Sequence, residues 1–225
     1  MPNTTYKISV ENKQTANVKY MLFMDTPDFS GDLQSWMLAW HTEYISGGDS
    51  SELEISDKFH AFARQESELC PLSNLPQAQV STVETVHLRR PAQPQLQEKI
   101  TSDEPSLEKA TATAEKDAFQ INTGSDFLDP NSRYVLGLAM ETPTGLVAPV
   151  AVTAPRTKMN ISVKPKMKFF VAESYHGPRE IVDYKPTVRD AATIDFTSGE
   201  GAGKFNARVV QGKDHSFEVT YHDTL

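Results

Sequence analysis

Cysteine is almost absent from the chain: Cys70 stands alone among 225 residues, so no disulfide can form within it. The cysteine content therefore gives no mark of an oxidising compartment. A reactive thiolate needs a positive environment, and Arg64 is the one basic residue near Cys70 in the sequence. These features exclude a disulfide framework and argue against a cysteine nucleophile.

Long apolar segments are also missing. No run approaches the roughly 18 apolar residues of a membrane-spanning helix. Met1 is followed by polar residues and not by the charged and apolar regions of a secretory signal. The sequence therefore predicts a cytoplasmic protein without a membrane span, with non-classical release as the alternative.

Positive charge is in short supply as well. The formal net charge is −8 at pH 7, whereas a nucleic-acid-binding domain is usually basic. We therefore expect no nucleic-acid partner. Solubility is the simplest explanation of the negative charge, although an acidic surface can also suit a cationic partner.

The motifs of the common cofactor sites are not found. Residues 199–204 are rich in glycine, but Ser198 stands where a phosphate loop needs its first glycine, and Phe205 stands where it needs serine or threonine. No dinucleotide fingerprint is present either. We expect no cofactor and interpret 199–204 as a turn between two strands.

Metal-ligand patterns are equally weak. Aspartates cluster in expected loops: Asp25, Asp28, Asp32 and Asp49. Their spacing does not match the calcium-binding helix-loop-helix motif, whose terminal glutamate is missing. His60 can join His41 and Glu43 if their strands pair, but spacing alone does not establish a zinc site. We predict no metal.

What the sequence does contain is a series of short strands. The clearest one spans 161–171, where apolar side chains alternate with polar ones. Because successive side chains of a strand point to opposite faces, this segment has one buried face and one lysine-bearing face. The apolar face carries Ile161, Val163, Pro165, Met167, Phe169 and Val171. A half-exposed sheet of this kind is typical of antiparallel β-structure.

The predicted fold class is all-β: an antiparallel β-sandwich of about ten strands forming a single domain over 1–225. Residues 70–118 differ from the rest, because proline and polar side chains dominate there. We expect this part to be a polar insertion or a long hairpin. Within it, 80–88 reads as a weak strand and 106–117 as a short charged helix.

Five segments follow one another along the chain in a recognisable order: Tyr6–Val10, Tyr20–Pro27, Leu38–Trp40, Asn160–Pro165 and Ala191–Phe196. This order resembles the rhizosphere-induced RhiA-like proteins. The similarity covers roughly residues 6–63 and 134–221, and its motifs are strand signatures of a β-sandwich. The family has no established reaction and no assigned catalytic residues. The resemblance therefore indicates a family relationship but identifies no functional residue in this chain.

His41 and Glu43 are the candidate catalytic residues. If 36–45 is a strand, their side chains project from the same face, where a histidine can act as general base and a glutamate can orient it. The alternative for the pair is a histidine hydrogen-bonded at a sheet surface. A helix is the alternative for the segment, but its aromatic residues and the Gly-Gly turn after it favour a strand.

Two further sets are candidate ligand-binding residues. Trp36, Trp40 and Tyr44 would share the other face of 36–45 and form a carbohydrate-stacking platform if exposed; the alternative is that they belong to the core. Lys164, Lys166 and Lys168 form a basic stripe that suits an anionic group. Lysines of this kind also protect strand edges from pairing with other chains.

The function predicted from these features is a non-enzymatic binding or interaction protein whose partner is an unknown small ligand or glycan. The alternative is a cofactor-free isomerase or cyclase that acts on a small metabolite through His41 and Glu43, so the sequence leaves open whether the protein is an enzyme. Strand edges can also mediate homo-oligomers.

Overall fold

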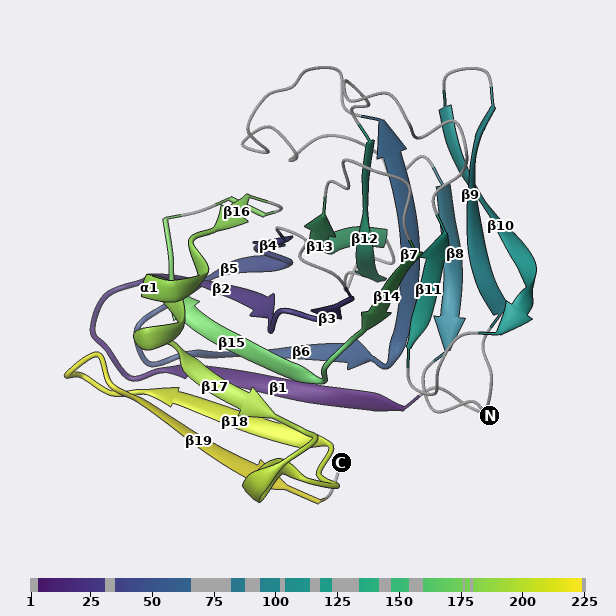
Figure 1. The fold of residues 1–225 in the computed structure, drawn as a ribbon. Coiled ribbons are helices and arrows are strands. Elements are labelled where there is room, and N and C mark those ends of the chain that lie inside the picture. The colour runs from purple at the N-terminus through teal and green to yellow at the C-terminus, as the bar shows by residue number, and fades with distance from the viewer. Residues whose placement is uncertain are drawn as a thin grey trace.

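The computed structural model describes residues 4–30, 35–65, 82–87, 94–101, 104–113, 118–122, 134–141, 147–153, 160–175, 177–178 and 180–223. These residues are mostly strands, with one six-residue α-helix, α1 (Tyr184–Arg189), and one 3-10 turn, η3 (Gly199–Gly201) (Figure 1). The all-β class is confirmed. Within these ranges, no helix has the length and apolar character to cross a membrane.

Two of the four sheets form the part of the fold that carries the candidate site. The first has the order β19 (Phe217–His222), β18 (Asn206–Gln211), β1 (Thr5–Asn12) and β6 (Ser50–Ser56). The second has the order β17 (Ala192–Asp195), β15 (Lys168–Glu173), β2 (Val18–Met24) and β5 (His41–Ile45). They lie one above the other, as Figure 1 shows, and aromatic pairs such as Tyr6–Phe196, with ring centroids 4.7 Å apart, join them.

The other two sheets make up the second half of the molecule. One has the order β10 (Glu104–Thr113), β9 (Pro94–Thr101), β11 (Phe119–Asn122), β14 (Asn160–Lys164) and β3 (Asp28–Phe29). The other has the order β16 (Ile181–Val182), β4 (Ser35–Leu38), β13 (Val147–Thr153), β12 (Tyr134–Glu141), β7 (Lys58–Gln65) and β8 (Thr82–His87). One contiguous cluster of buried residues contains side chains from all four sheets.

Most strand pairs are antiparallel, but β1 pairs with β18 in parallel, and β11 pairs with β9 in parallel. The register places Asn12 beside Gln211, although one residue comes early in the chain and the other late. The ends of β1 and β18 therefore meet at the same edge of the fold. The turn after β1 and the turn after β18 both begin at this edge, where the candidate site lies.

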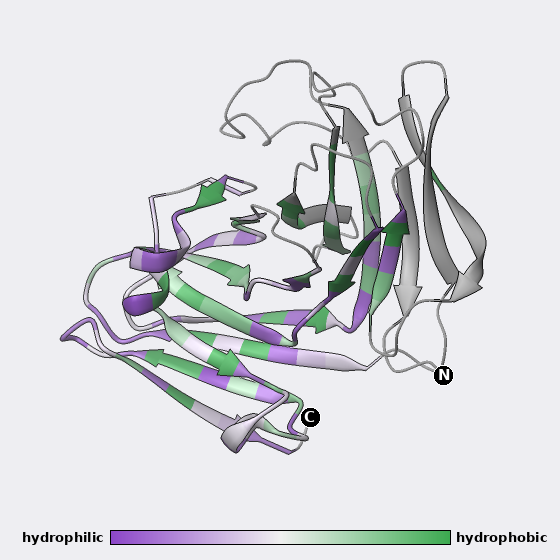
Figure 2. Ribbon diagram, viewed as in Figure 1, coloured by the Kyte–Doolittle hydropathy of each residue, from purple (hydrophilic) through white to green (hydrophobic). Residues whose placement is uncertain are grey.

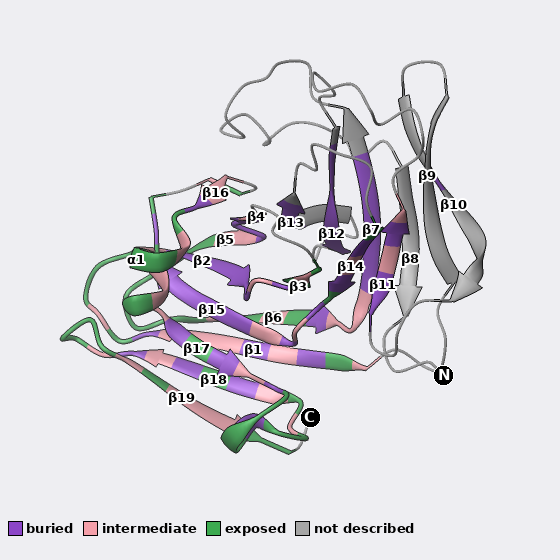
Figure 3. Ribbon diagram, in the orientation of Figure 1, coloured by how far each residue is buried: buried purple, intermediate pink, exposed green. Residues whose placement is uncertain are grey.

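The predicted strand at 161–171 is wrong in one respect: the chain forms β14 and β15, which belong to different sheets. The alternation of burial continues across the break, since Val163, Pro165 and Met167 are buried while Lys164 is exposed (Figures 2 and 3). Phe169, Phe170 and Val171 are all buried, because β15 is covered on both faces. A change of sheet therefore leaves the period-2 pattern intact.

The predicted strand at 36–45 divides in the same way. It forms β4 and β5 in two different sheets, separated by Ala39 and Trp40. The backbone N–H of Ala39 donates to Glu180 at 2.9 Å, and that of Trp40 donates to Leu22 at 2.9 Å. These long-range hydrogen bonds hold the crossover between the sheets, and the helix alternative for the segment is excluded.

The polar region 70–118 contributes strands β8, β9 and β10 to the described structure. The predicted helix at 106–117 is wrong, because β10 covers Glu104–Thr113 and pairs antiparallel with β9. Residues 66–81, 88–93, 102–103 and 114–117 lie outside the described residues, and so does Cys70. The weak strand predicted at 80–88 is confirmed by β8. In total the described chain has nineteen strands, since the sequence pattern merged several and missed β9 and β10.

Candidate functional site

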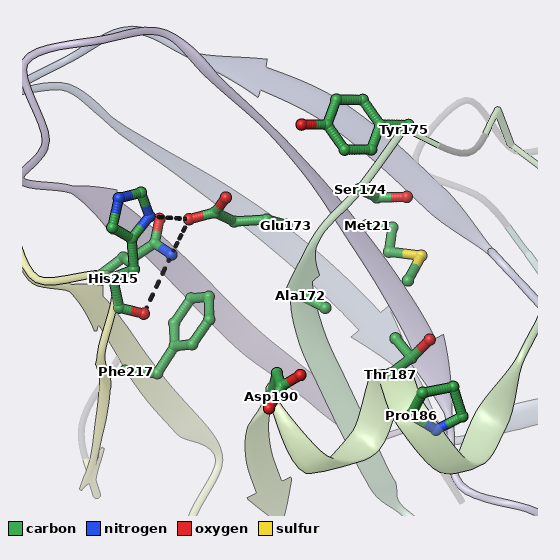
Figure 4. Close-up of a pocket in the computed structure, with 11 residues that line it drawn as sticks. Met21, Ala172, Glu173, Ser174, Tyr175, Pro186, Thr187, Asp190, His215 and Phe217 are labelled. Carbon is green, nitrogen blue, oxygen red and sulfur yellow. Dashed lines mark hydrogen bonds and ion pairs between the residues drawn. The ribbon is translucent and has the colours of Figure 1, made fainter.

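A cavity of about 470 Å³ opens at one end of the sandwich, between the end of β15, helix α1 and the turn that joins β18 to β19 (Figure 4). Its polar lining consists of Glu173, Ser174, Thr187, Asp190, Gln211 and His215. Its apolar lining consists of Met21, Ala172, Pro186 and Phe217, with Tyr175 also present. The volume falls in the range of about 300 to 1,000 Å³ that is usual for small-molecule sites.

The central polar contact of this cavity joins Glu173 to His215. Nδ1 of His215 lies 2.8 Å from Oε1 of Glu173 (Figure 4). Glu173 is the last residue of β15, and His215 lies in the β18–β19 turn with a φ of 66°. A residue other than glycine rarely adopts this left-handed conformation, which is enriched at functional sites. The turn therefore holds the imidazole toward the carboxylate at some conformational cost.

A buried amide supports this pair from below. Gln211 has no exposed surface, and its Nε2 donates to Oε1 of Glu173 at 2.5 Å. Its Oε1 accepts from the hydroxyl of Tyr20 at 2.5 Å and from Nε2 of Gln14 at 2.8 Å. Nε2 of Gln14 also lies 3.0 Å from Oε1 of Glu173. Three side chains, those of His215, Gln14 and Gln211, thus hold one carboxylate oxygen before any ligand arrives, and Tyr20 in turn holds Gln211.

These contacts decide the ionisation of the site. Burial raises the pKa of Glu173, but hydrogen bonds from His215, Gln14 and Gln211 outweigh it and lower the pKa below its ordinary value of 4.5. Burial, together with the negative charge of Glu173, raises the pKa of Tyr20 to about 12. At neutral pH the network therefore contains an ionised carboxylate and a protonated phenol, whose hydroxyl donates a hydrogen bond to Oε1 of Gln211.

Helix α1 forms the opposite wall and is held by Tyr184. The Tyr184 ring packs edge-on against Phe23 and Phe170, with centroids 6.5 and 5.9 Å away. Its hydroxyl donates to Oδ1 of Asp25, whose Oδ2 lies 3.2 Å from Nζ of Lys168. Burial, followed by the hydrogen bond to Asp25, raises the pKa of Tyr184 to about 12. The wall is therefore anchored in the core through Tyr184, and Val188 of the same helix also packs against the core.

The structure brings the predicted catalytic residues together but gives them little space. Nε2 of His41 lies 3.5 Å from Oε2 of Glu43 on β5, and Oγ of Ser51 donates to the same oxygen at 2.6 Å. The cavity beside them measures about 30 Å³. A space of this size holds a water molecule or two and no metabolite.

The predicted aromatic platform does not form. Trp36 lies on β4 and is half-buried, Trp40 lies between the sheets and is 3% exposed, and Tyr44 on β5 is 73% exposed. The change of sheet at Trp40 separates the three side chains. Nζ of Lys19 lies 5.7 Å from the ring centroid of Tyr44, so this ring has a cation on its face.

The three candidate lysines do not form a free basic stripe. Nζ of Lys166 lies 2.6 Å from Oδ1 of Asp28, and Nζ of Lys168 pairs with Asp25. Lys164 is exposed and lies on β14, in a different sheet from Lys168. Two of the lysines are thus neutralised by the loop aspartates that the sequence had offered as calcium ligands.

No group of three or more histidine, cysteine, aspartate or glutamate side chains able to hold a metal occurs in the described part of the chain. His60 does not join His41, since it lies on β7 in another sheet. Its Nε2 is 3.4 Å from Oε1 of Glu141, which also pairs with Lys58. The proposed three-residue cluster around His41 therefore does not assemble.

The residues of the large cavity were missed by sequence reasoning. Glu173 and His215 are 42 positions apart, and Gln14 is 159 positions from Glu173. No spacing motif joins residues at such separations. The available signals were weak: a polar residue that ends an apolar strand and a histidine in a tight turn.

Comparison with family models, with curated proteins and with solved structures gives no significant match to this chain. The resemblance to the RhiA-like proteins therefore stays a prediction, and the site must be interpreted from its own geometry.

Proposed function

We propose that this protein is a non-enzymatic binding protein that holds a small organic ligand in the cavity beside Glu173 and His215. The observation that carries the proposal is a cavity of about 470 Å³ whose polar wall is fixed by a hydrogen-bond network built on the buried side chains of Gln211 and Tyr20. Preorganised polar groups above an apolar floor are the usual arrangement of a small-ligand site. Rigid side chains of this kind lower the entropy cost of binding.

The lining indicates which groups the ligand carries. Glu173 and Asp190 offer carboxylate oxygens, so the ligand presents hydrogen-bond donors such as hydroxyl or amine groups. Phe217 and Met21 supply apolar surface, and Tyr175 is fully exposed at the rim. A ring with one apolar face and several donors, as in a saccharide, is compatible with this combination.

The alternative function, an isomerase or cyclase that uses His41 and Glu43, has less support. Their separation of 3.5 Å suits an acid–base pair, but a catalytic pair needs room for a substrate within hydrogen-bond reach. The adjoining cavity of about 30 Å³ is too small for one. Membership of the RhiA-like family, a cytoplasmic location and homo-oligomers formed through strand edges are further proposals from the sequence.

The experiment is a fragment screen by ligand-observed NMR with a pair of variants on α1. Thr187→Trp places a large side chain in the lining, whereas Lys185→Trp places the same side chain on the helix outside it. We expect fragments that bind the wild type and Lys185→Trp but not Thr187→Trp. If the screen gives no such fragments, or if Thr187→Trp binds them equally well, the proposal is wrong.

A further inference from the structure

We propose that the ligand held in this cavity carries a cationic amine, and that Glu173 is the residue that selects for it. This inference rests on the proposed function, because it names the chemistry of the ligand at the same site. It depends on three features of the cavity: the sign of its charged lining, the unused oxygen of Glu173 and the aromatic rings nearby.

The charged side chains that line the cavity favour a cation. Glu173 and Asp190 are carboxylates, His215 is an imidazole, and the described residues of the lining include no lysine or arginine. Arg189 is adjacent to Asp190 in the sequence, and its Nε and Nη2 donate to the carboxylate of Asp190 at 3.0 and 2.9 Å. Arg189 therefore offsets the negative charge of Asp190, and the negative charge of Glu173 remains in the lining.

Glu173, whose side chain is 41% exposed, differs in its partners from three more buried carboxylates. Glu11 pairs with Arg208, Asp25 with Lys168, and Glu141 with Lys58. The partners that the structure describes for Glu173 are His215, Gln14 and Gln211. An ionised carboxylate held by amides and an imidazole retains an attraction for a further cation, which solvent screens in part because the group is partly exposed.

The geometry leaves one oxygen of Glu173 for that cation. The contacts of Glu173 with His215, Gln14 and Gln211 all meet at Oε1. Figure 4 draws the contact with His215. Oε1 has thus reached its capacity as an acceptor, while the contacts described for this carboxylate do not include Oε2. An ammonium group at Oε2 would complete the site, and the rings of Tyr175 and Phe217 line the same cavity and can stabilise a cation.

Two matched series of compounds test the inference by calorimetry at about pH 8, where aliphatic amines are protonated. The aromatic series is 2-phenylethylamine, 2-phenylethanol and phenylacetate. The polyol series is N-methylglucamine, sorbitol and gluconate. Within each series the phenyl or polyol scaffold is nearly constant, and the terminal group is a cation, a neutral alcohol or an anion. Differences in Kd therefore report the charge preference of the site.

We expect the amine of at least one series to bind at least about tenfold more tightly than its alcohol, with the anion weakest. Glu173→Gln should remove this preference, whereas Glu218→Gln, on an exposed position of β19 outside the lining, should keep it. Circular dichroism checks that each variant is folded. In the wild type, raising the salt concentration should weaken the binding of the amine and not that of the alcohol, because salt screens ionic attraction.

Other outcomes overturn the inference. If an alcohol binds as tightly as its amine, or if the preference survives in Glu173→Gln, the cation inference is wrong while the proposed binding function stands. If no compound of either series binds up to about 10 mM, where a Kd near 1 mM would be detected, the inference is wrong. The fragment screen with Thr187→Trp then decides separately whether the cavity binds anything.

Discussion

Nδ1 of His215 lies 2.8 Å from Oε1 of Glu173, although 42 positions separate the two residues in the chain. The contact joins the β18–β19 turn of one sheet to the end of β15 in the other. Gln211 connects both residues, since its Nε2 donates to Glu173 and lies 3.5 Å from the backbone oxygen of His215. The pair is therefore both the wall of a cavity and a link between two sheets.

The first prediction concerns Gln211. Replacing it with leucine keeps most of its volume but leaves the Tyr20 hydroxyl without its acceptor and Glu173 without one donor. An unsatisfied buried polar group costs about 1 to 3 kcal/mol, so we expect Gln211→Leu to lower the free energy of unfolding by that amount in urea titrations.

A double-mutant cycle gives the control for this prediction. Tyr20→Phe alone removes the hydroxyl that donates to Gln211. In the Gln211→Leu background the hydroxyl has already lost this acceptor, so Tyr20→Phe should add little or nothing. Strictly additive effects of the two substitutions would contradict the network.

The second prediction concerns the anchor of α1. Tyr184→Phe keeps the ring contacts with Phe23 and Phe170 but removes the hydrogen bond to Asp25. A hydrogen bond to a charged group contributes about 1.5 to 3 kcal/mol, so we expect a loss of this size in urea titrations. Tyr175→Phe is the matched control, because Tyr175 is fully exposed and its change should leave stability unaltered. Equal stability of the two variants would contradict the anchoring role of Tyr184.

The third prediction concerns Gly137 on β12. A Cβ at this position would lie 2.1 Å from the backbone oxygen of Ala151 on β13, a separation that forces the two strands apart. Overpacking of this kind costs about 1 to 3 kcal/mol, so Gly137→Ala should lower the melting temperature clearly. Gly177→Ala is the control, because there the Cβ would meet the flexible side chain of Glu180. The assigned β12–β13 register would be contradicted by a Gly137→Ala protein as stable as this control.

The fourth prediction concerns pH. The pKa of Glu141 is lowered by its hydrogen bond to Lys58. Burial raises the pKa values of Glu173 and Asp195, but their hydrogen bonds outweigh it and lower both. Because the unfolded chain takes up protons on these groups before the folded chain does, the stability that they contribute is present above the ordinary carboxyl pKa. It is lost as the pH falls through their lowered values.

We therefore expect the urea midpoint to be steady near neutral pH and to fall below about pH 4.5. Glu173→Gln should make this decrease shallower, because it removes one of the groups responsible. A midpoint that rises on acidification, or an unchanged slope in the variant, would show that Glu173 is not held by the contacts described above.

Much of the fold was predictable because the alternation of buried and exposed side chains along a strand is kept even where the chain changes sheet. The buried positions Val163, Pro165 and Met167 alternate as the sequence predicts. The change of sheet between β14 and β15 was not predictable, since a strand that crosses from one sheet to another keeps its period of two. The sequence pattern reports which side chains are buried, and it does not report which sheet buries them.

The candidate site was much less predictable. His41 and Glu43 were found because they are two positions apart on one strand, but a short spacing contains no information about cavity volume. β18 pairs in parallel with β1, which places Gln211 opposite Asn12 at the edge of the fold where it contacts Glu173. Such a long-range pairing has no local signal, so a site that depends on it becomes visible only in the folded structure.

The most direct test of the cavity's role is a crystal structure of the protein soaked with 2-phenylethylamine or N-methylglucamine. The account predicts density for an amine in the cavity between β15, α1 and the β18–β19 turn, with its nitrogen about 2.7 to 2.9 Å from Oε2 of Glu173. An empty cavity in crystals where the amine occupies another surface would contradict it.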